Sequence, residues 1–249
     1  MAEGEWGVGR MSEPEEIIAV VVQLLARREQ LRGRRIVVSA GGTREPLDDV
    51  RFVGNRSSGR MGVAVAEEAR RRGADVTLVA ANIAVPAPPS VEVVQAPTAA
   101  DLEREVLARV DDADAVVMAA AVADYRPMEV AAGKRGKDGA TWTIELEPTT
   151  DVLRTLGERD DAAVLVGFAA ESGAEAIDRA RRKLTDKNAN LIVFNDVSRT
   201  DIGFDAEENE VVLIGERTER RVEKAPKRAV AAAIVDEIAR LLEERDGRD

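Results

Sequence analysis

The stretch "RRIVVSAGGTREPLDDVRFVGNRSSGRMGVAVAEEARRRG" (residues 34–73) decides the fold. Its first part, residues 34–40, is a short apolar run that predicts a buried strand. Residues 60–73 repeat apolar positions at helical spacing and end in Gly73, which predicts a helix closed by a glycine. A glycine-rich connection, residues 41–59, joins the two. The stretch therefore predicts one strand-to-helix unit of an α/β fold.

The same alternation continues along the chain. Further strands are predicted at residues 75–81, 114–121, 162–170 and 190–196. Further helices are predicted at residues 98–112, 149–159, 173–188 and 227–245. Apolar strands that alternate with amphipathic helices predict a mainly parallel sheet with helices on both faces. Right-handed crossovers then give a doubly wound, Rossmann-like sheet.

Two segments depart from this alternation. Residues 141–147, "TWTIELE", alternate apolar and polar positions and predict an exposed antiparallel strand. Residues 209–223 predict a hairpin. We therefore expect a small antiparallel flap or hairpin beside the parallel sheet.

The N-terminal region predicts a separate helix over residues 12–30. Ser12 is the expected N-cap, Glu15 would complete a capping box, and Pro14 lies in the first turn. The apolar stripe of this helix is wide, so we expect it to pack on something.

Charge and hydropathy bound the class of protein. The net charge of −11 argues against binding to nucleic acid or to a membrane surface. No apolar run is long enough for a transmembrane helix, and residues 1–16 lack the apolar core of a signal peptide. We therefore expect a cytoplasmic protein.

The composition narrows the chemistry. The 249-residue chain has no cysteine and no histidine. This excludes disulfides, zinc sites built on those residues, thiolate nucleophiles and histidine general bases. The remaining Lys, Arg, Asp, Glu, Asn and backbone groups suit charge stabilisation on phosphates. The sequence alone leaves the metal ligands unknown.

The strand ends carry the first candidate binding residues. Gly41, Gly42 and Thr43 follow the first strand, where bare backbone N–H groups and a hydroxyl suit a phosphate. The pattern is neither GxGxxG nor a Walker A motif, so a plain turn is the alternative. Asp124, after the strand at 114–121, could accept hydrogen bonds from ribose hydroxyls or orient a cation, or could be a turn residue.

The connection before helix 60–73 carries the next candidates. They are Arg51, Asn55, Arg56, Ser57, Ser58 and Gly59. A helix N-terminus has unpaired N–H groups and a partial positive charge, so this stretch predicts an anion site. The alternative is an ordinary helix cap.

Lysine is scarce and concentrated. Lys134 and Lys137 lie in the glycine-flanked loop 133–137, which predicts a mobile flap that closes over phosphates. Lys183 and Lys187 are spaced to share one helical face. The alternatives are a solvated charge cluster for the loop and a solvent-facing pair on the helix.

Four motifs together resemble one family. They are "SAGGTREPLDDVRFVGNRSSGRMG" (39–62), "AAAVADYRP" (119–127), "GFAAE" (167–171) and "KLTDKNANLIVFNDV" (183–197). They resemble the phosphopantothenate–cysteine ligases of coenzyme A biosynthesis, over about residues 33–245. The resemblance implies that CTP activates 4′-phosphopantothenate to an acyl-cytidylate with release of pyrophosphate. Cysteine then attacks and CMP leaves. Mg²⁺ is expected to neutralise the triphosphate.

The resemblance also implies residue roles. Asn55 would be needed to convert the acyl-cytidylate, Arg51 would be functional, and Lys134 would serve activation through its charge. Lys137 joins Asn55 and Arg51 as a candidate substrate-binding residue. The implied nucleotide-binding residues are Gly41, Gly42, Thr43, Ser57, Ser58, Gly59, Ala121, Asp124, Lys134, Thr150, Asp151, Val152, Leu153, Phe168, Lys183 and Lys187. Where the family has an "NPD" element this chain has "TTD" (149–151), which leaves the contact of residues 149–153 less specific.

The family implies partners as well. A homodimer is expected, with the flap between residues 126 and 146 and nearby strands at its interface. Residues 1–32 resemble the end of an upstream flavin-dependent decarboxylase domain followed by a linker helix, so the ligase domain would be 33–249 with no flavin of its own.

Three alternatives remain open. A short Rossmann oxidoreductase would need a lysine four residues after Tyr125, where Glu129 stands. A nucleotide-binding module without turnover is the second alternative. The third is a ligase that uses ATP.

Overall fold

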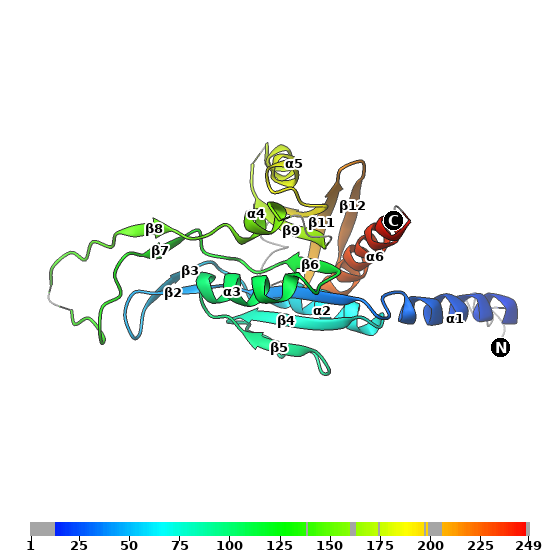
Figure 1. The fold of residues 1–249 in the computed structure, drawn as a ribbon, viewed down its shortest axis with the longest axis horizontal. Helices are drawn as coiled ribbons and strands as arrows, with labels where there is room; N and C mark the ends of the chain where they lie inside the picture. Colours follow the sequence, from blue (N-terminus) through cyan, green and yellow to red (C-terminus); the bar gives the residue numbers. More distant parts are fainter. Residues whose placement is uncertain are drawn as a thin grey trace, which may run out of the picture.

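The computed structural model describes residues 13–137, 139–159, 163–173, 175–196, 198 and 206–247 (Figure 1). Its centre is an eight-stranded sheet in the order β12-β11-β10-β9-β6-β1-β4-β5. The strands are β1 (Arg35–Gly41), β4 (Asp75–Ala81), β5 (Glu92–Gln95), β6 (Ala115–Met118), β9 (Val164–Glu171), β10 (Leu191–Asp196), β11 (Glu208–Gly215) and β12 (Glu219–Pro226).

The order of the parallel strands confirms the predicted doubly wound sheet. From β5 to β10 all neighbours are parallel, and numbering these strands along the chain gives the order 3-2-1-4-5-6 of a Rossmann sheet. The direction of the winding reverses between β1 and β6. β11 and β12 extend the sheet as the predicted antiparallel hairpin.

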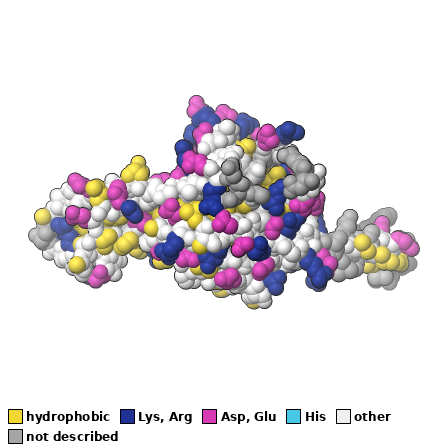
Figure 2. Space-filling model, viewed as in Figure 1, with side chains coloured by type: hydrophobic (Ala, Val, Ile, Leu, Met, Phe, Trp, Pro, Cys, Tyr) yellow, Lys and Arg dark blue, Asp and Glu magenta, His cyan; other side chains and the backbone are white. Residues whose placement is uncertain are grey.

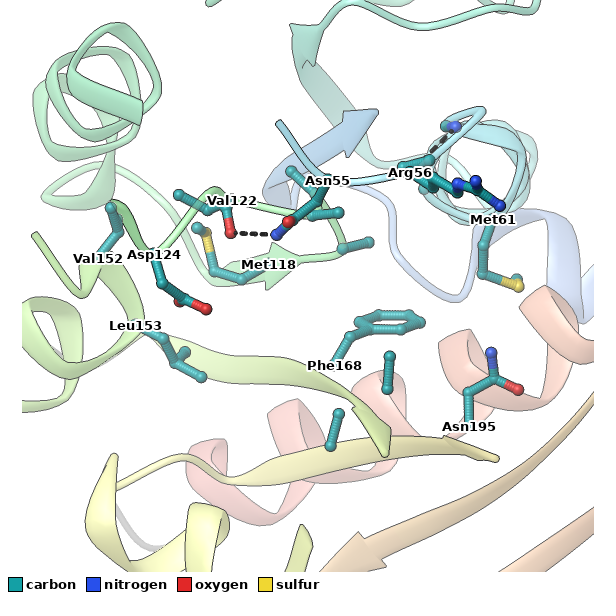
Figure 3. Close-up of a pocket in the computed structure, with 18 of the residues that line it drawn as sticks. Asn55, Arg56, Met61, Met118, Val122, Asp124, Val152, Leu153, Phe168 and Asn195 are labelled. Atoms are coloured by element: carbon teal, nitrogen blue, oxygen red, sulfur yellow. Dashed lines mark hydrogen bonds between the residues drawn. The ribbon is translucent and has the colours of Figure 1, made fainter. Parts of the chain in front are cut away.

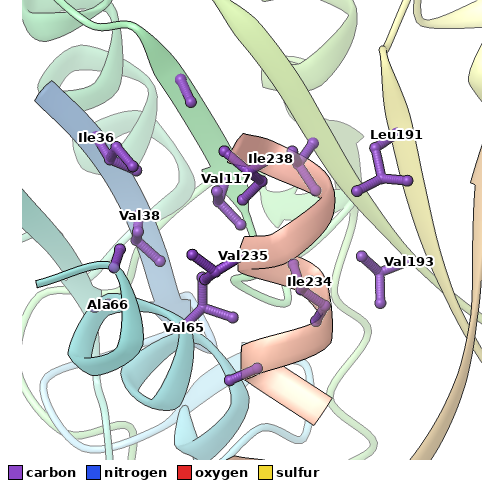
Figure 4. Packing of buried hydrophobic residues seen from close by; sticks show 14 of the residues in the cluster. Ile36, Val38, Val65, Ala66, Val117, Leu191, Val193, Ile234, Val235 and Ile238 are labelled. Atoms are coloured by element: carbon purple, nitrogen blue, oxygen red, sulfur yellow. The ribbon is translucent and has the colours of Figure 1, made fainter. Parts of the chain in front are cut away.

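Helices cover both faces of the sheet. They are α2 (Arg60–Arg71), α3 (Ala99–Val110), α4 (Val152–Gly157), α5 (Ala176–Asp186) and α6 (Lys227–Asp246). α2 and α6 pack on one face, while α3, α4 and α5 pack on the other. Figure 4 shows Val65 of α2 and Val235 and Ile238 of α6 gathered against Val38 of β1.

β1 is buried on both faces because its side chains alternate between the two cores. Ile36 and Val38 point to the α2–α6 side, and Val37 points to the α3–α5 side. At this density even one added carbon matters: a Cβ on Gly62 of α2 would lie 2.6 Å from the Cβ of Ala40. The close approach of α2 to β1 therefore fixes the start of the helix at the end of the strand.

α1 (Pro14–Glu29) projects away from the sheet (Figure 1). Its N-cap is Glu13, whereas the predicted N-cap Ser12 lies outside the described residues. Ile17, Ile18 and Val22 are exposed, so within this chain they do not pack as expected (Figure 2).

The end of α1 is held by one buried arginine. Arg72 is 1% exposed and donates to Gln30 Oε1 at 2.9 Å, to Glu68 Oε1 at 2.7 Å and to Asp236 Oδ1 at 2.6 Å. These bonds link the residue that follows α1 to both α2 and α6. Among the described residues, no helix is long and apolar enough to cross a bilayer.

Two short strand pairs form an arm that extends from the sheet (Figure 1). We use "the arm" for residues 44–54 and 125–148. Its strands are β2 (Arg44–Pro46), β3 (Phe52–Gly54), β7 (Tyr125–Pro127) and β8 (Leu146–Pro148).

The sequence did not predict β2, β3 or β7. The predicted strand at 141–147 was wrong in extent, because only β8 pairs, and its partner β7 is three residues long. Trp142, which began the predicted strand's apolar face, instead packs on two arginine side chains.

Candidate active site

A cavity of about 800 Å³ opens at the carboxyl ends of the parallel strands, where the winding reverses. In a doubly wound sheet this is the expected position of a ligand. Asp124 after β6, Phe168 of β9 and Asn195 of β10 point into it (Figure 3). The start of α2 closes the opposite wall.

Thirteen predicted site residues line this cavity. They are Asn55, Arg56, Ser57, Gly59, Ala121, Asp124, Thr150, Asp151, Val152, Leu153, Phe168, Lys183 and Lys187. Residues distant in the sequence therefore meet in one place, as the strand-end reasoning predicted.

The start of α2 has the properties predicted for an anion site. Its N-cap, Gly59, has φ +79°, and no side chain of the described residues caps the helix. Ser57 Oγ accepts from the N–H of Gly59 at 3.3 Å, just outside the helix. Residues 60–62 of the first turn line the cavity, and the helix dipole makes this end positive.

Asn55 lies beside that helix start. Its Nδ2 donates to the carbonyl oxygen of Val122 at 2.8 Å (Figure 3). This bond joins the loop before α2 to the segment after β6. One N–H of the amide and the lone pairs of Oδ1 remain available to a ligand.

Gly41, Gly42 and Thr43 do not line this cavity, and two of the N–H groups expected in the phosphate cradle are paired with carbonyl oxygens of the chain. The N–H of Gly42 donates to Ala81 O at 2.7 Å, and that of Thr43 to Ala121 O at 3.2 Å. The Thr43 hydroxyl is buried and accepts from the N–H of Ala123 at 2.9 Å. A Cβ on Gly42 would lie 2.6 Å from the Asn55 carbonyl oxygen. These residues therefore support the cavity wall from behind. Ser58 is also buried behind the wall.

The opposite wall is built around α4. Asp151 is the N-cap, and its Oδ1 accepts from the N–H of Arg154 at 3.0 Å. Its other oxygen pairs with Lys187 of α5. Burial raises the pKa of Asp151, but Lys187 and the Arg154 N–H outweigh burial and hold that pKa below its ordinary value. The "TTD" element thus ends in the N-cap of α4, Asp151, which also forms an ion pair with a lysine of the cavity.

Lys183 contributes a desolvated cation. Its Nζ donates to Phe168 O at 2.8 Å, which binds α5 to β9 at the cavity floor. Burial lowers the pKa of this ammonium, while Asp151 opposes that shift. The solvent-facing alternative for Lys183 and Lys187 is therefore wrong, since both line the cavity.

Arg51, Lys134 and Lys137 are absent from the cavity wall. They lie on the arm (Figure 1): Arg51 in the turn between β2 and β3, and the two lysines in the loop between β7 and β8. Lys134 and Lys137 are exposed, whereas Arg51 is half-buried against Asp48. The structure thus divides the predicted site residues into three groups: those that line the cavity, those that lie behind its wall, and those on the arm.

Asn195 is a cavity residue that sequence reasoning did not single out. Its side chain lines the cavity at the end of β10, and its buried Oδ1 has no hydrogen-bond partner among the described residues. An unpartnered buried amide is costly, so the cavity is suited to a polar ligand. The signal was present in the strand-end motif "FNDV", where an asparagine ends an apolar strand.

The described residues contain no group of three or more carboxylates that could hold a metal ion by themselves. The cavity wall does carry separate carboxylates, among them Asp124 and Glu171. Mg²⁺ commonly binds through one or two carboxylates together with substrate phosphates and water. The cavity therefore fits a magnesium ion that is shared with a phosphate ligand.

The chain was compared with known proteins. The family profile described as the DNA/pantothenate metabolism flavoprotein C-terminal domain matches residues 31–242. The coenzyme A biosynthesis bifunctional protein CoaBC of Mycobacterium tuberculosis (strain H37Rv) is 42% identical over 253 residues, which cover 95% of this chain. The alignment spans 60% of that protein's length.

Solved structures share the fold. The crystal structure of a C-terminal domain of coenzyme A biosynthesis bifunctional protein CoaBC matches with a TM-score of 0.74 and 39% identity, over 87% of this chain and 99% of that one. A Cab2 mutant in complex with phosphopantothenate-cysteine matches with a TM-score of 0.71 at 17% identity, over 94% and 92% of the two chains.

Proposed function

The chain belongs to the family of the DNA/pantothenate metabolism flavoprotein C-terminal domain, and on that premise we propose that it is a phosphopantothenate–cysteine ligase. In the first step, a carboxylate oxygen of 4′-phosphopantothenate attacks the α-phosphorus of CTP, which forms an acyl-cytidylate and releases pyrophosphate. In the second step, the amine of cysteine attacks the acyl carbon. An amide bond forms, CMP leaves, and the amine proton passes to solvent.

The observation that carries the proposal is the uncapped start of α2 beside Asn55 in a cavity lined by three lysines, Lys183, Lys187 and Lys227. An uncapped helix start and a desolvated ammonium both attract phosphate. The triphosphate of the nucleotide would lie at Ser57 and Gly59, with Lys183 and Lys187 on the facing wall. Asp124 would accept from the ribose hydroxyls, next to Phe168 and residues 149–153. Mg²⁺ carried by the triphosphate would neutralise part of its charge.

Asn55 is assigned to the second step. Its bond to Val122 O fixes the amide plane at the cavity rim. The remaining N–H can donate to the acyl oxygen as negative charge develops there. Asn55 does not itself react, which agrees with a chain that has neither cysteine nor histidine.

The positions of Arg51 and Lys134 support a homodimer. Both cations lie on the arm, outside the cavity of their own chain. The arm also exposes Phe52, Tyr125 and Met128, which are 50%, 53% and 57% exposed (Figure 2). An apolar surface with cations at its end suits a second copy whose cavity requires them. In this arrangement each arm completes the site of its partner.

Three further expectations belong to the same proposal. Residues 1–32 would be a linker helix and the end of an upstream flavin-dependent decarboxylase domain, with the ligase domain at 33–249. The full-length protein would then act in the cytoplasm. CTP is favoured over ATP by the resemblance to the bacterial bifunctional proteins.

Pyrophosphate release tests the function directly. The purified chain is given 4′-phosphopantothenate and Mg²⁺ with CTP or ATP, with and without cysteine. We expect release with CTP and faster turnover with cysteine. Pyrophosphate release with ATP alone would mean that the ligase uses ATP and not CTP. Tight CTP binding without pyrophosphate release would favour a nucleotide-binding module without turnover.

A further inference from the structure

A cluster of four side chains ties the two halves of the arm together. We call Asp48, Arg51, Arg135 and Trp142 the arm cluster. Asp48 and Arg51 belong to the β2–β3 hairpin, while Arg135 and Trp142 belong to the loop between β7 and β8. The glycines of the loop lie in open space: among the described residues, nothing lies within 4 Å of a Cβ placed on Gly133, Gly136 or Gly139.

Asp48 is the buried centre of the cluster. Its side chain is fully buried, and its oxygens accept from the N–H groups of Val50 at 2.8 Å, Arg51 at 2.7 Å and Arg135 at 3.2 Å. The Arg51 guanidinium adds a bond of 2.6 Å through Nη1. One carboxylate therefore fixes the tip of the hairpin and the loop at once.

Trp142 is the second element of the cluster. Its ring stacks under the guanidinium of Arg135, with 4.8 Å from Cζ to the ring centroid, and under that of Arg51 at 5.5 Å. Both distances lie within the range of a cation–π interaction. Arg51 Nη1 also donates to Arg135 O at 3.2 Å. Two like charges thus lie close together because the ring and Asp48 compensate them.

The cluster decides where the neighbouring cations lie. Arg135 is half-buried in the cluster, and Lys134, the residue before it, is exposed. Arg51 uses only Nη1 within the described chain, so Nε and Nη2 remain available as donors. The arm therefore presents two cations from different loops with a fixed spacing.

We propose that Asp48 and Trp142 are positioning residues for the activation step, since they hold Arg51 and the segment that carries Lys134 as one preformed unit. The inference rests on the proposed function, because activation is the step that Lys134 serves there. Neither residue needs to touch the substrate.

Two measurements test the inference in the full chain. The first is the rate of tryptic cleavage after Lys134, Arg135 and Lys137, which reports how firmly the loop is held. The second is pyrophosphate release with 4′-phosphopantothenate and CTP. For Trp142→Ala and Asp48→Asn we expect cleavage about tenfold faster and kcat about tenfold lower, with little change in the KM for CTP.

Matched variants separate positioning from general damage. Trp142→Tyr keeps an aromatic face and is expected to stay within about twofold of the parent in both measurements. Glu147→Gln breaks the exposed Arg126–Glu147 pair elsewhere on the arm and is expected to leave both unchanged. Light scattering gives the mass of each variant.

The outcomes are distinct. Unchanged cleavage in Trp142→Ala overturns the inference, and so does faster cleavage with unchanged kcat. A Trp142→Ala chain that only dissociates also overturns it, because Trp142 would then be a subunit contact. If the parent releases no pyrophosphate, the proposed function fails together with the activation role. Tryptic cleavage still shows whether the cluster holds the loop.

Discussion

Asn55 and Arg51 flank the same short strand, β3, but the two ends of that strand belong to different regions. Four residue-to-residue steps of extended chain separate them by about 13 Å. Asn55 lies at the cavity rim, where backbone bonds such as Gly42 N–H to Ala81 O hold the neighbouring segment to the sheet. Arg51 lies on the arm, where its carbonyl oxygen accepts from the N–H of Leu47 at 2.8 Å and its guanidinium is held by Asp48 and Trp142. Adjacency in a motif therefore does not place two residues in one site.

The largest expected effect separates the two chemical steps at the cavity rim. Asn55→Asp should slow the second step about 100- to 1000-fold, since a carboxylate cannot donate to the acyl oxygen or to Val122 O. Rapid quenching with labelled CTP should show an acyl-cytidylate that accumulates with the pyrophosphate burst. Gln95→Glu makes the same charge change on an exposed edge strand and serves as the control. Product formation at the parent's rate would remove Asn55 from the mechanism.

Lys134→Gln should affect the first step instead, by about 100-fold, because a charge on the triphosphate is lost. Lys224→Gln, on β12, is the control of equal charge change.

Mixing the Lys134→Gln protein with the Asn55→Asp protein sharpens the comparison of rim and arm. If arms complete partner sites, re-formed mixed dimers should restore about a quarter of the parent's sites by subunit statistics. No restoration after exchange would mean that each arm serves its own chain.

The cavity rim and the arm should also differ in how much unfolding free energy is lost when a glycine is replaced by alanine. Gly41 has φ +93°, and a Cβ there would lie 1.9 Å from Ala81 O, so Gly41→Ala should cost about 2 to 4 kcal/mol of unfolding free energy. Gly136→Ala, on the arm, meets nothing within 4 Å and should change that free energy by less than about 1 kcal/mol. Urea unfolding followed by circular dichroism measures both. Equal losses would mean that the arm is packed as tightly as the rim.

The smallest expected effect is the loss of stability of the arm at low pH. Burial raises the pKa of Asp48, but three N–H groups and Arg51 hold it below the ordinary value of 3.8. A lowered pKa means that the ionised carboxylate stabilises the arm above pH 3.8, and that this contribution is lost as the pH falls through the lower, folded value. In a Trp6→Phe background, Trp142 is the single tryptophan, and its fluorescence should report the loss. If the acid transition in Trp142 fluorescence stays at the same pH in Asp48→Asn, the Asp48 carboxylate is not the group that causes it.

The sheet could be predicted because its strands are apolar on both faces, which leaves few alternatives for residues such as Val37 and Val38. The strand-end rule also placed Asp124 and Phe168 in one cavity. The role of Gly42 could not be predicted, because its N–H donates to Ala81, a residue whose approach depends on the register of β1 with β4.

The strands of the arm, by contrast with those of the sheet, could not be predicted from the sequence. β2, β3 and β7 have three residues each and no apolar period that a pattern could detect. The alternation of "TWTIELE" predicts a strand, whereas Trp142 contacts two arginines, Arg51 of the β2–β3 hairpin and Arg135 of its own loop. A cation–π contact between distant segments leaves no periodic trace in either of them.

The buried Arg72 gives α1 a mechanical property. At 1.5 Å per residue, the 16 residues of α1 extend about 24 Å from the end that Arg72 holds. A tilt of about 5° at that end displaces the far end by about 2 Å. Because Arg72 also bonds to α6 through Asp236, a small shift of α6 against the sheet would tilt α1 and displace its far end. The direction of α1 is thus set at one end of the helix, by bonds that lie in the core.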